Sequence, residues 1–187
     1  AEDVAPSIAQ PARRFTELLA YDRRGKPVKV EARIDVDGLR DGVSSMYSWT
    51  SSDGTTNLPV PPDWPLPIAI RVGGELVAEV ELPELPGQEA KVLVLPVDVT
   101  TCRLLSPDGE PVSIRSYSVF EDHQDGTGSG RGGGGTLDDI QLVWWPDGHQ
   151  NQAEVSLRGD DVEGSRTVLG PGETCEIVGQ AVETAML

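Results

Sequence analysis

Apolar and charged residues alternate over several stretches of the chain. Every second residue is apolar in residues 28–36, which is the pattern of a strand with one buried face. The alternation returns in residues 68–72, and apolar residues resume in residues 76–80 after the pair Gly73-Gly74. Two apolar runs joined by a glycine pair predict a β-hairpin over residues 68–82.

The second half of the chain follows the same pattern. Val155 and Leu157 alternate with polar residues and precede a turn at residues 159–161. No window has convincing helical periodicity, and 21 glycines and 15 prolines break the 187 residues into many short segments. Short strands at regular spacing with turn residues between them predict an all-β sandwich architecture.

The chain also resembles itself at a distance of about 84 residues. An apolar strand, a polar turn ending in glycine, one charged residue and Pro-Val occur at residues 18–28 and again at residues 102–112. Gly25 and Gly109 are 84 positions apart, and a Pro-Gly pair before a closing strand recurs at an offset of 85. Two landmarks at nearly the same offset predict two tandem copies of one unit.

These motifs resemble those of a known family. The run Asp22-x-x-Gly25-Lys26-Pro27-Val28, the Ser52-to-Thr55 turn and Pro86-Gly87 before the last strand are similar to those of carboxypeptidase regulatory-like domains. These domains belong to the transthyretin-like and Cna-B-like group. The resemblance implies two tandem Greek-key β-sandwiches, transthyretin-like or immunoglobulin-like, and an accessory role as a stalk, linker or adhesive module of secreted and surface proteins.

The repeat map predicts the domain organisation. The two copies are expected to join near residues 96–100 without a flexible linker, which predicts a fairly rigid pair. The predicted segments are an N-terminal arm (1–13), sandwich repeat 1 (14–97), sandwich repeat 2 (98–182) with a flexible Gly-rich loop (126–135), and a C-terminal tail (183–187).

The charge of the chain restricts its partners. With 31 acidic against 15 basic residues, the formal net charge is −16. Such a surface repels phosphate backbones and anionic membranes, so we expect no nucleic-acid partner. No stretch approaches the ~20 apolar residues of a membrane helix, so membrane insertion is not expected. The chain begins at Ala1 without an initiator Met, as expected after removal of a leader or for a piece of a longer protein.

The two cysteines, Cys102 and Cys175, fall in the opening and closing strands of the second copy. The first and last strands of such sandwiches can be neighbours, so a disulfide is geometrically reasonable and would indicate an oxidising, extracellular or cell-surface location. The alternative is a pair of buried thiols in a reduced protein. Two distant cysteines provide too few ligands for a metal site.

Four tryptophans are candidates for contacts with a ligand or a subunit: Trp49, Trp64, Trp144 and Trp145. Adjacent residues of a strand face opposite sides, so one of Trp144 and Trp145 is expected in the core and the other at the surface. An exposed indole could stack on a sugar or anchor a neighbouring subunit. The alternative for all four is core packing.

No motif of the chain encodes a reaction. The chain lacks a nucleophile elbow and a phosphate loop, and the acidic run around His123 (residues 121–125) lacks the spacing of a metal site and is expected to be a solvated loop. We therefore expect no catalytic, cofactor-binding or metal-binding residues. The predicted function is a non-catalytic structural or adhesive subunit of a surface assembly that self-associates through its arms. The alternative is a carbohydrate-binding accessory module.

Overall fold

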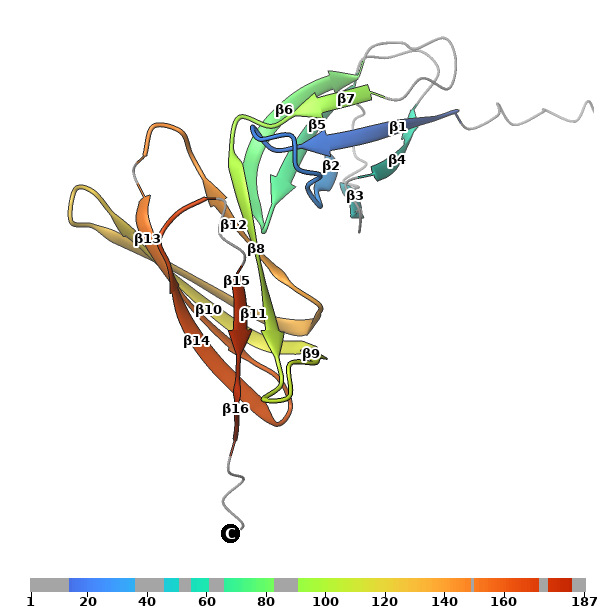
Figure 1. The fold of residues 1–187 in the computed structure, drawn as a ribbon. Coiled ribbons are helices and arrows are strands. Elements are labelled where there is room, and N and C mark those ends of the chain that lie inside the picture. Colours follow the sequence, from blue (N-terminus) through green and yellow to red (C-terminus); the bar gives the residue numbers. More distant parts are fainter. Residues whose placement is uncertain are drawn as a thin grey trace, which may run out of the picture.

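The computed structural model describes residues 14–35, 46–50, 55–60, 66–82, 91–148, 150–171 and 175–182. Every secondary-structure element of these residues is a strand, so the predicted all-β class is confirmed. None of the described segments is a helix with the length and apolarity of a membrane crossing. The strands form two lobes, of which the N-terminal one lies at the upper right of Figure 1 and the C-terminal one below it.

The first lobe contains two sheets that face each other across one apolar core. The sheets have the strand orders β4-β1-β7 and β3-β2-β5-β6. The core includes Leu18 and Ala20 from one sheet and Ile68 and Ile70 from the other, all at most 1% exposed. The strands are β1 (Arg14–Tyr21), β2 (Glu31–Asp35), β3 (Met46–Thr50), β4 (Thr55–Val60), β5 (Leu66–Val72), β6 (Glu75–Leu82) and β7 (Lys91–Val94).

Strands β5 and β6 form the predicted hairpin. They pair antiparallel and are joined by Gly73 and Gly74, whose φ angles are +56° and +87°. Two consecutive residues with positive φ are the requirement of the type I′ hairpin turn, which glycine meets without a steric penalty. The prediction from alternation and a glycine pair is confirmed here.

The second lobe has the same construction. Its sheets have the orders β12-β8-β15, with β9 also pairing to β8, and β11-β10-β13-β14-β16. Its separate core includes Leu104, Ile114, Leu142 and Leu157. The strands are β8 (Asp98–Leu105), β9 (Pro111–Val112), β10 (Ile114–His123), β11 (Gly128–Leu137), β12 (Ile140–Trp144), β13 (Gln150–Arg158), β14 (Val162–Val168), β15 (Cys175–Val178) and β16 (Gln180–Ala181).

The strand orders of the two lobes correspond position by position. The order β4-β1-β7 matches β12-β8-β15, and β3-β2-β5-β6 matches β11-β10-β13-β14. In both lobes the first strand has a parallel partner from the C-terminal part of the lobe: β1 pairs with β7, where Leu18 is opposite Lys91, and β8 pairs with β15, where Cys102 is opposite Cys175. Both turns after the first strand close on a glycine of positive φ, Gly25 at +78° and Gly109 at +88°.

The Gly-rich segment differs from its prediction. Most of residues 126–135 belong to strand β11, which pairs antiparallel with β10. The expected flexible loop is therefore wrong, and only Gly126 and Thr127 of this segment lie in the turn that precedes the strand. A Cβ on Gly133 would lie 2.9 Å from the Tyr117 ring, and one on Gly128 would lie 2.5 Å from the Phe120 ring. Aromatic rings of β10 therefore cover the glycines, and such cover compensates for the poor strand propensity of glycine.

A second correction concerns residues 121–125. Strand β10 continues through Glu121, Asp122 and His123, and the turn begins at Gln124. The expected loop is therefore wrong for the first half of this acidic run. The ladder with β13 holds the strand here, although its register shifts between Asp122 and His123.

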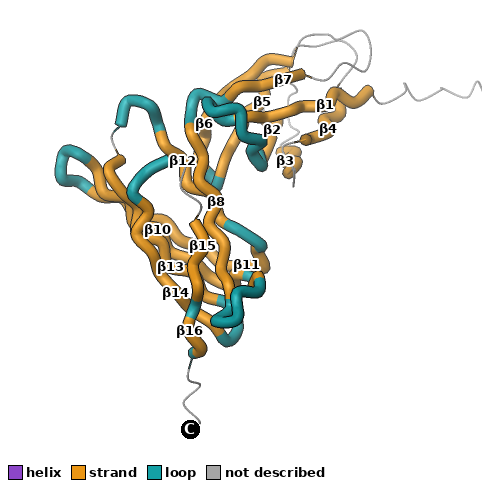
Figure 2. Tube along the Cα trace, in the orientation of Figure 1, coloured by secondary structure: helices purple, strands orange, loops and turns teal. Residues whose placement is uncertain are grey.

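The lobes share structure at their junction. Strand β8 runs from the first lobe into the second (Figures 1 and 2). Val99 of β8 and Val143 of β12 belong to the core of the first lobe, whereas Cys102 and Leu142 of the same strands belong to the core of the second. Because strand side chains alternate between faces, the β8–β12 ladder contributes to both cores.

Candidate functional site at the junction of the lobes

The chain crosses between the lobes as a buried, hydrogen-bonded segment. Leu95 and Val97 are fully buried, and the Leu95 N–H donates to the Tyr21 carbonyl at 2.7 Å. The Arg23 N–H donates to the Val97 carbonyl at 3.0 Å. A flexible linker would expose its backbone to solvent, whereas this one is fixed against the first lobe.

Charged side chains add to these contacts. The Asp98 carboxylate lies 3.8 Å from the Arg23 guanidinium and 3.6 Å from that of Arg24. Lys29 of the first lobe lies 3.8 Å from the Asp139 carboxylate of the second. The three cations are at least partly exposed, so each ion pair contributes little energy individually, but they add ionic contacts at the junction.

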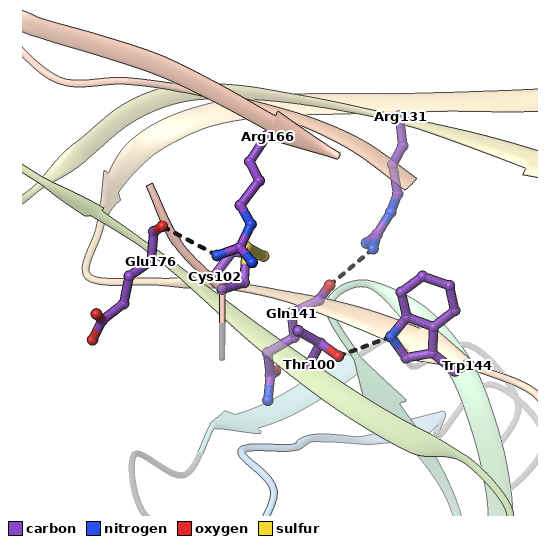
Figure 3. The surroundings of a disulfide bond; sticks show 8 residues. Thr100, Cys102, Arg131, Gln141, Trp144, Arg166 and Glu176 are labelled. Carbon is purple, nitrogen blue, oxygen red and sulfur yellow. Dashed lines mark hydrogen bonds between the residues drawn. A yellow bond between two sulfur atoms is a disulfide. The ribbon is translucent and has the colours of Figure 1, made fainter. Parts of the chain in front are cut away.

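Arg131 of the Gly-rich strand links three elements. Its Nη1 donates to the carbonyl oxygen of Gly73 in the first lobe, and its Nη2 donates to the carbonyl oxygen of Gln141 at 2.8 Å. Figure 3 shows the guanidinium directed at Gln141. Its Nε lies 3.9 Å from Glu121 and has no hydrogen bond. The planar guanidinium group can donate to two carbonyl oxygens in fixed positions, so the Arg131 side chain holds the hairpin turn against β12.

The hairpin turn approaches β12 too closely for any side chain. A Cβ on Gly73 would lie 2.5 Å from the Gln141 carbonyl oxygen, and the positive φ of Gly73 also favours glycine. Gly73 is therefore required both by the turn and by the contact between the lobes. The turn was predictable from the sequence, whereas the close contact between the lobes was not.

The adjacent tryptophans point to different lobes. Trp144 is 5% exposed in the second core, and its Nε1–H donates to Thr100 Oγ1 at 2.9 Å (Figure 3). Trp145 is half-buried, packs against the first core, and donates from Nε1 to Glu75 Oε1 at 2.6 Å. Trp144 is thus too deeply buried to contact a ligand, and the prediction that it is a contact residue is wrong. Trp145 remains a candidate.

A cavity of about 570 Å³ opens beside Trp145, between the hairpin turn and the ends of β10, β11 and β13. Its polar lining includes Glu75, Glu121, His123, Arg131 and Gln150. Gln150 Nε2 donates to Glu121 Oε2 at 3.3 Å, and His123 Nε2 is 3.1 Å from Ser129 Oγ. We name this space the junction cleft. Its volume is in the range of small-molecule sites.

Two carboxyl groups of the second lobe have lowered pKa values, and both lie outside the junction cleft. The hydrogen bond from the Arg115 guanidinium, supported by its charge, holds the pKa of Asp160 below its usual range. The hydrogen bonds from the Thr127 hydroxyl and N–H lower the pKa of Asp125 in the turn between β10 and β11. Both groups are exposed, so we attribute their lowered pKa values to these local hydrogen bonds rather than to a reactive centre.

The two cysteines meet in the second core. In the structure a disulfide joins Cys102 of β8 to Cys175 of β15, with the Cα atoms 4.4 Å apart. Both residues are at most 1% exposed, and they are direct partners in the parallel ladder. Figure 3 shows Arg166 nearby, whose Nη1 reaches the Glu176 carbonyl at 3.5 Å.

The remaining predicted contact residues fall largely outside the described part of the chain. This holds for the side chain of Trp49 in β3 and for all of Trp64. Among the described residues no three potential metal ligands cluster. Sequence reasoning did not find Glu75, Glu121 and Gln150 as neighbours of Trp145, because they come from different strands and no spacing connects them.

Comparisons with known proteins leave the family open. No family model matches the chain, and no curated protein does. Among solved structures, a mutant shaft pilin of Lactobacillus rhamnosus GG is 10% identical with a TM-score of 0.33, covering 91% of this chain and 99% of the pilin. The minor pilin of Streptococcus agalactiae is 11% identical with a TM-score of 0.33, covering 92% and 98%. Similarity at this level does not identify a function for this chain.

Proposed function

We propose that the chain is a non-catalytic structural or adhesive subunit of a surface assembly, built from two tandem repeats of one β-sandwich. The observation that carries this proposal is the junction, where β8 and β12 supply Val99 and Val143 to the first core and Cys102 and Leu142 to the second. Such sharing suits a rigid spacer that holds its two ends at a fixed separation and angle.

The tandem repeat is supported at two levels. The matching strand orders place a parallel strand pair, β1–β7 in the first lobe and β8–β15 in the second, at the same point of each lobe. The turns at Gly25 and Gly109, 84 positions apart, also have matching hydrogen bonds, from the glycine N–H to the carbonyl three residues earlier. We propose boundaries of 14–97 and 98–182 for the two repeats.

Self-association through extended segments is the form of assembly that we propose. Strand β11 is the longest edge strand among the described residues. It has no proline, and its one charged side chain, Arg131, is engaged at the junction. Edge strands that are not protected by charge or proline accept further strands. The segments 1–13 and 183–187 are the candidate donors.

Truncation tests this form of assembly. Particles of chains lacking residues 1–13 or residues 183–187 should contain fewer subunits, by multi-angle light scattering, than those of the full chain at the same concentration. Circular dichroism of each truncated chain controls for folding. The same number of subunits per particle for all three chains would exclude the arms as the means of association.

A second candidate function, carbohydrate binding, is favoured by the position of Trp145 in the junction cleft. The indole is half-buried and held by Glu75, so it is fixed before any ligand arrives. A preorganised aromatic side chain with polar neighbours is a common basis of small-ligand recognition.

A further inference from the structure

The junction cleft combines an aromatic side chain with fixed hydrogen-bonding groups that belong to different strands. Trp145 follows β12, Glu75 begins β6, Glu121 lies in β10 and Gln150 begins β13. The cleft is therefore completed only when the two lobes are joined. Its volume of about 570 Å³ is sufficient for a ligand of one or two sugar rings, within the range of known ligand pockets.

Each carboxylate in the cleft already has one protein donor and keeps further acceptor positions. Glu75 accepts from the Trp145 indole at 2.6 Å, and Glu121 accepts from the Gln150 amide at 3.3 Å. A carboxylate offers about four lone-pair sites, so both retain acceptors for hydroxyl groups. Gln150 has a second amide N–H, which can donate to a ligand oxygen.

The engagement of the two carboxylates by protein groups disfavours a metal ion as the ligand of the cleft. Arg131 lines the cleft and lies 3.9 Å from Glu121, and the bonds from Trp145 and Gln150 partly satisfy the two carboxylates. Cation sites need carboxylates that are free to surround the ion, and no cluster of three potential metal ligands occurs among the described residues.

These groups fit a neutral saccharide. The C–H faces of a sugar ring pack against an indole, while its hydroxyl groups both donate and accept hydrogen bonds. We propose that the junction cleft binds a neutral saccharide, with one ring against Trp145, hydroxyl donors to Glu75 and Glu121, and a hydroxyl acceptor for Gln150. This inference rests on the second candidate function and is independent of the assembly role.

Titration of the full chain with cellotetraose, maltotetraose, mannotetraose and N-acetylchitotetraose tests the proposal, read out by NMR of the backbone amides and indole N–H groups. We expect at least one of these saccharides to bind at millimolar concentration or below and to shift the Trp145 indole signal. Cadaverine serves as the cationic probe. Binding of none of the four saccharides overturns the proposal, as does binding of cadaverine alone.

Variants locate the site. Trp145→Ala and Gln150→Ala should each weaken saccharide binding at least about tenfold, which corresponds to ~1.4 kcal/mol. Gln152→Ala is the matched control, because Gln152 lies on the same strand and also donates to a carboxylate of β10, that of Asp122 at 3.2 Å, but does not line the cleft. It should bind like the unmodified chain.

Gln150→Ala keeps the test decisive if Trp145→Ala fails to fold, since Trp145 also packs on the first core. Unchanged saccharide binding in Gln150→Ala would by itself place the site elsewhere, as would unchanged binding in a folded Trp145→Ala variant. Either result would leave carbohydrate binding intact as a function. The oligomeric state of the two variants is measured separately, and a change in it bears on the assembly role only.

Discussion

Val99 and Val143 are cross-strand partners in the second lobe, yet both side chains enter the core of the first. The ladder that carries them also buries Thr100, Leu142 and Trp144 on its other face. Packing of the first lobe therefore depends on strands of the second, which distinguishes this chain from two sandwiches joined by a linker. We therefore expect the junction to be rigid.

Substitution of Val143 tests the shared core. Val143→Ala should destabilise the protein by about 1–3 kcal/mol, because it removes buried methyl groups and leaves a cavity. The measurement is urea unfolding, in which wild-type unfolding should be one cooperative transition. Val178→Ala is the control, since Val178 is 60% exposed and should change stability by less than about 0.5 kcal/mol. Equal effects of the two substitutions would exclude the shared core.

The Gly-rich strand makes a prediction that depends on position. A Cβ on Gly132 would lie 2.9 Å from the Tyr117 carbonyl oxygen, whereas one on Gly130 would have its nearest neighbour at 3.8 Å. Gly132→Ala should therefore destabilise the fold by about 1–3 kcal/mol. Gly130→Ala should be neutral or stabilising by about 0.5 kcal/mol, because alanine restricts the unfolded chain. Thermal unfolding of both variants checks this, and a destabilised Gly130→Ala variant would contradict it.

The sequence predicted strands well where a single local signal was sufficient. Alternation around the Gly73-Gly74 pair predicted the β5–β6 hairpin, because a type I′ turn and one buried face are both local requirements. The prediction for residues 126–135 was wrong. It took account of the low strand propensity of glycine, but not of the packing of Tyr117 and Phe120 of β10 over these glycines. Propensity is a weak guide where cross-strand packing decides.

The junction cleft was beyond sequence reasoning for a different reason. Trp145 was identified as a candidate from its residue type and its neighbour Trp144. Its hydrogen-bond partner Glu75 is 70 positions away in the chain, and the two meet only because the β5–β6 hairpin docks on β12. Such a pairing depends on how the lobes are joined, which no spacing or periodicity records.

Reduction tests the disulfide between Cys102 and Cys175. Intact mass spectrometry should find the oxidised chain 2 Da lighter than the reduced one, a difference of about two hydrogen atoms for one bond between sulfurs. Since the bond spans a sequence separation of 73, reduction should lower the free energy of unfolding by about 4 kcal/mol on the chain-entropy model. The double variant Cys102→Ala/Cys175→Ala gives the comparison of unfolding free energies without reductant. Identical masses would show that the chain carries two thiols.

The lowered pKa of Asp160 predicts a titration with a definite sign. The group binds fewer protons in the folded state than in the unfolded chain, where its pKa is about 3.9. Its stabilising effect is therefore present above that pH and is lost as the pH falls through the folded value. Arg115→Gln removes the first cause and should raise the Asp160 pKa in an NMR titration of carboxyl carbons. An unchanged Asp160 pKa in this variant would contradict the assigned cause.

The structural-subunit role is tested most directly by negative-stain electron microscopy of the full chain over a range of concentrations. We predict filaments, shells or oligomers of defined size in which each subunit appears as two lobes at a constant angle. A strict monomer at every concentration, or lobes at widely varying angles, would contradict the proposed role of a rigid, self-associating subunit.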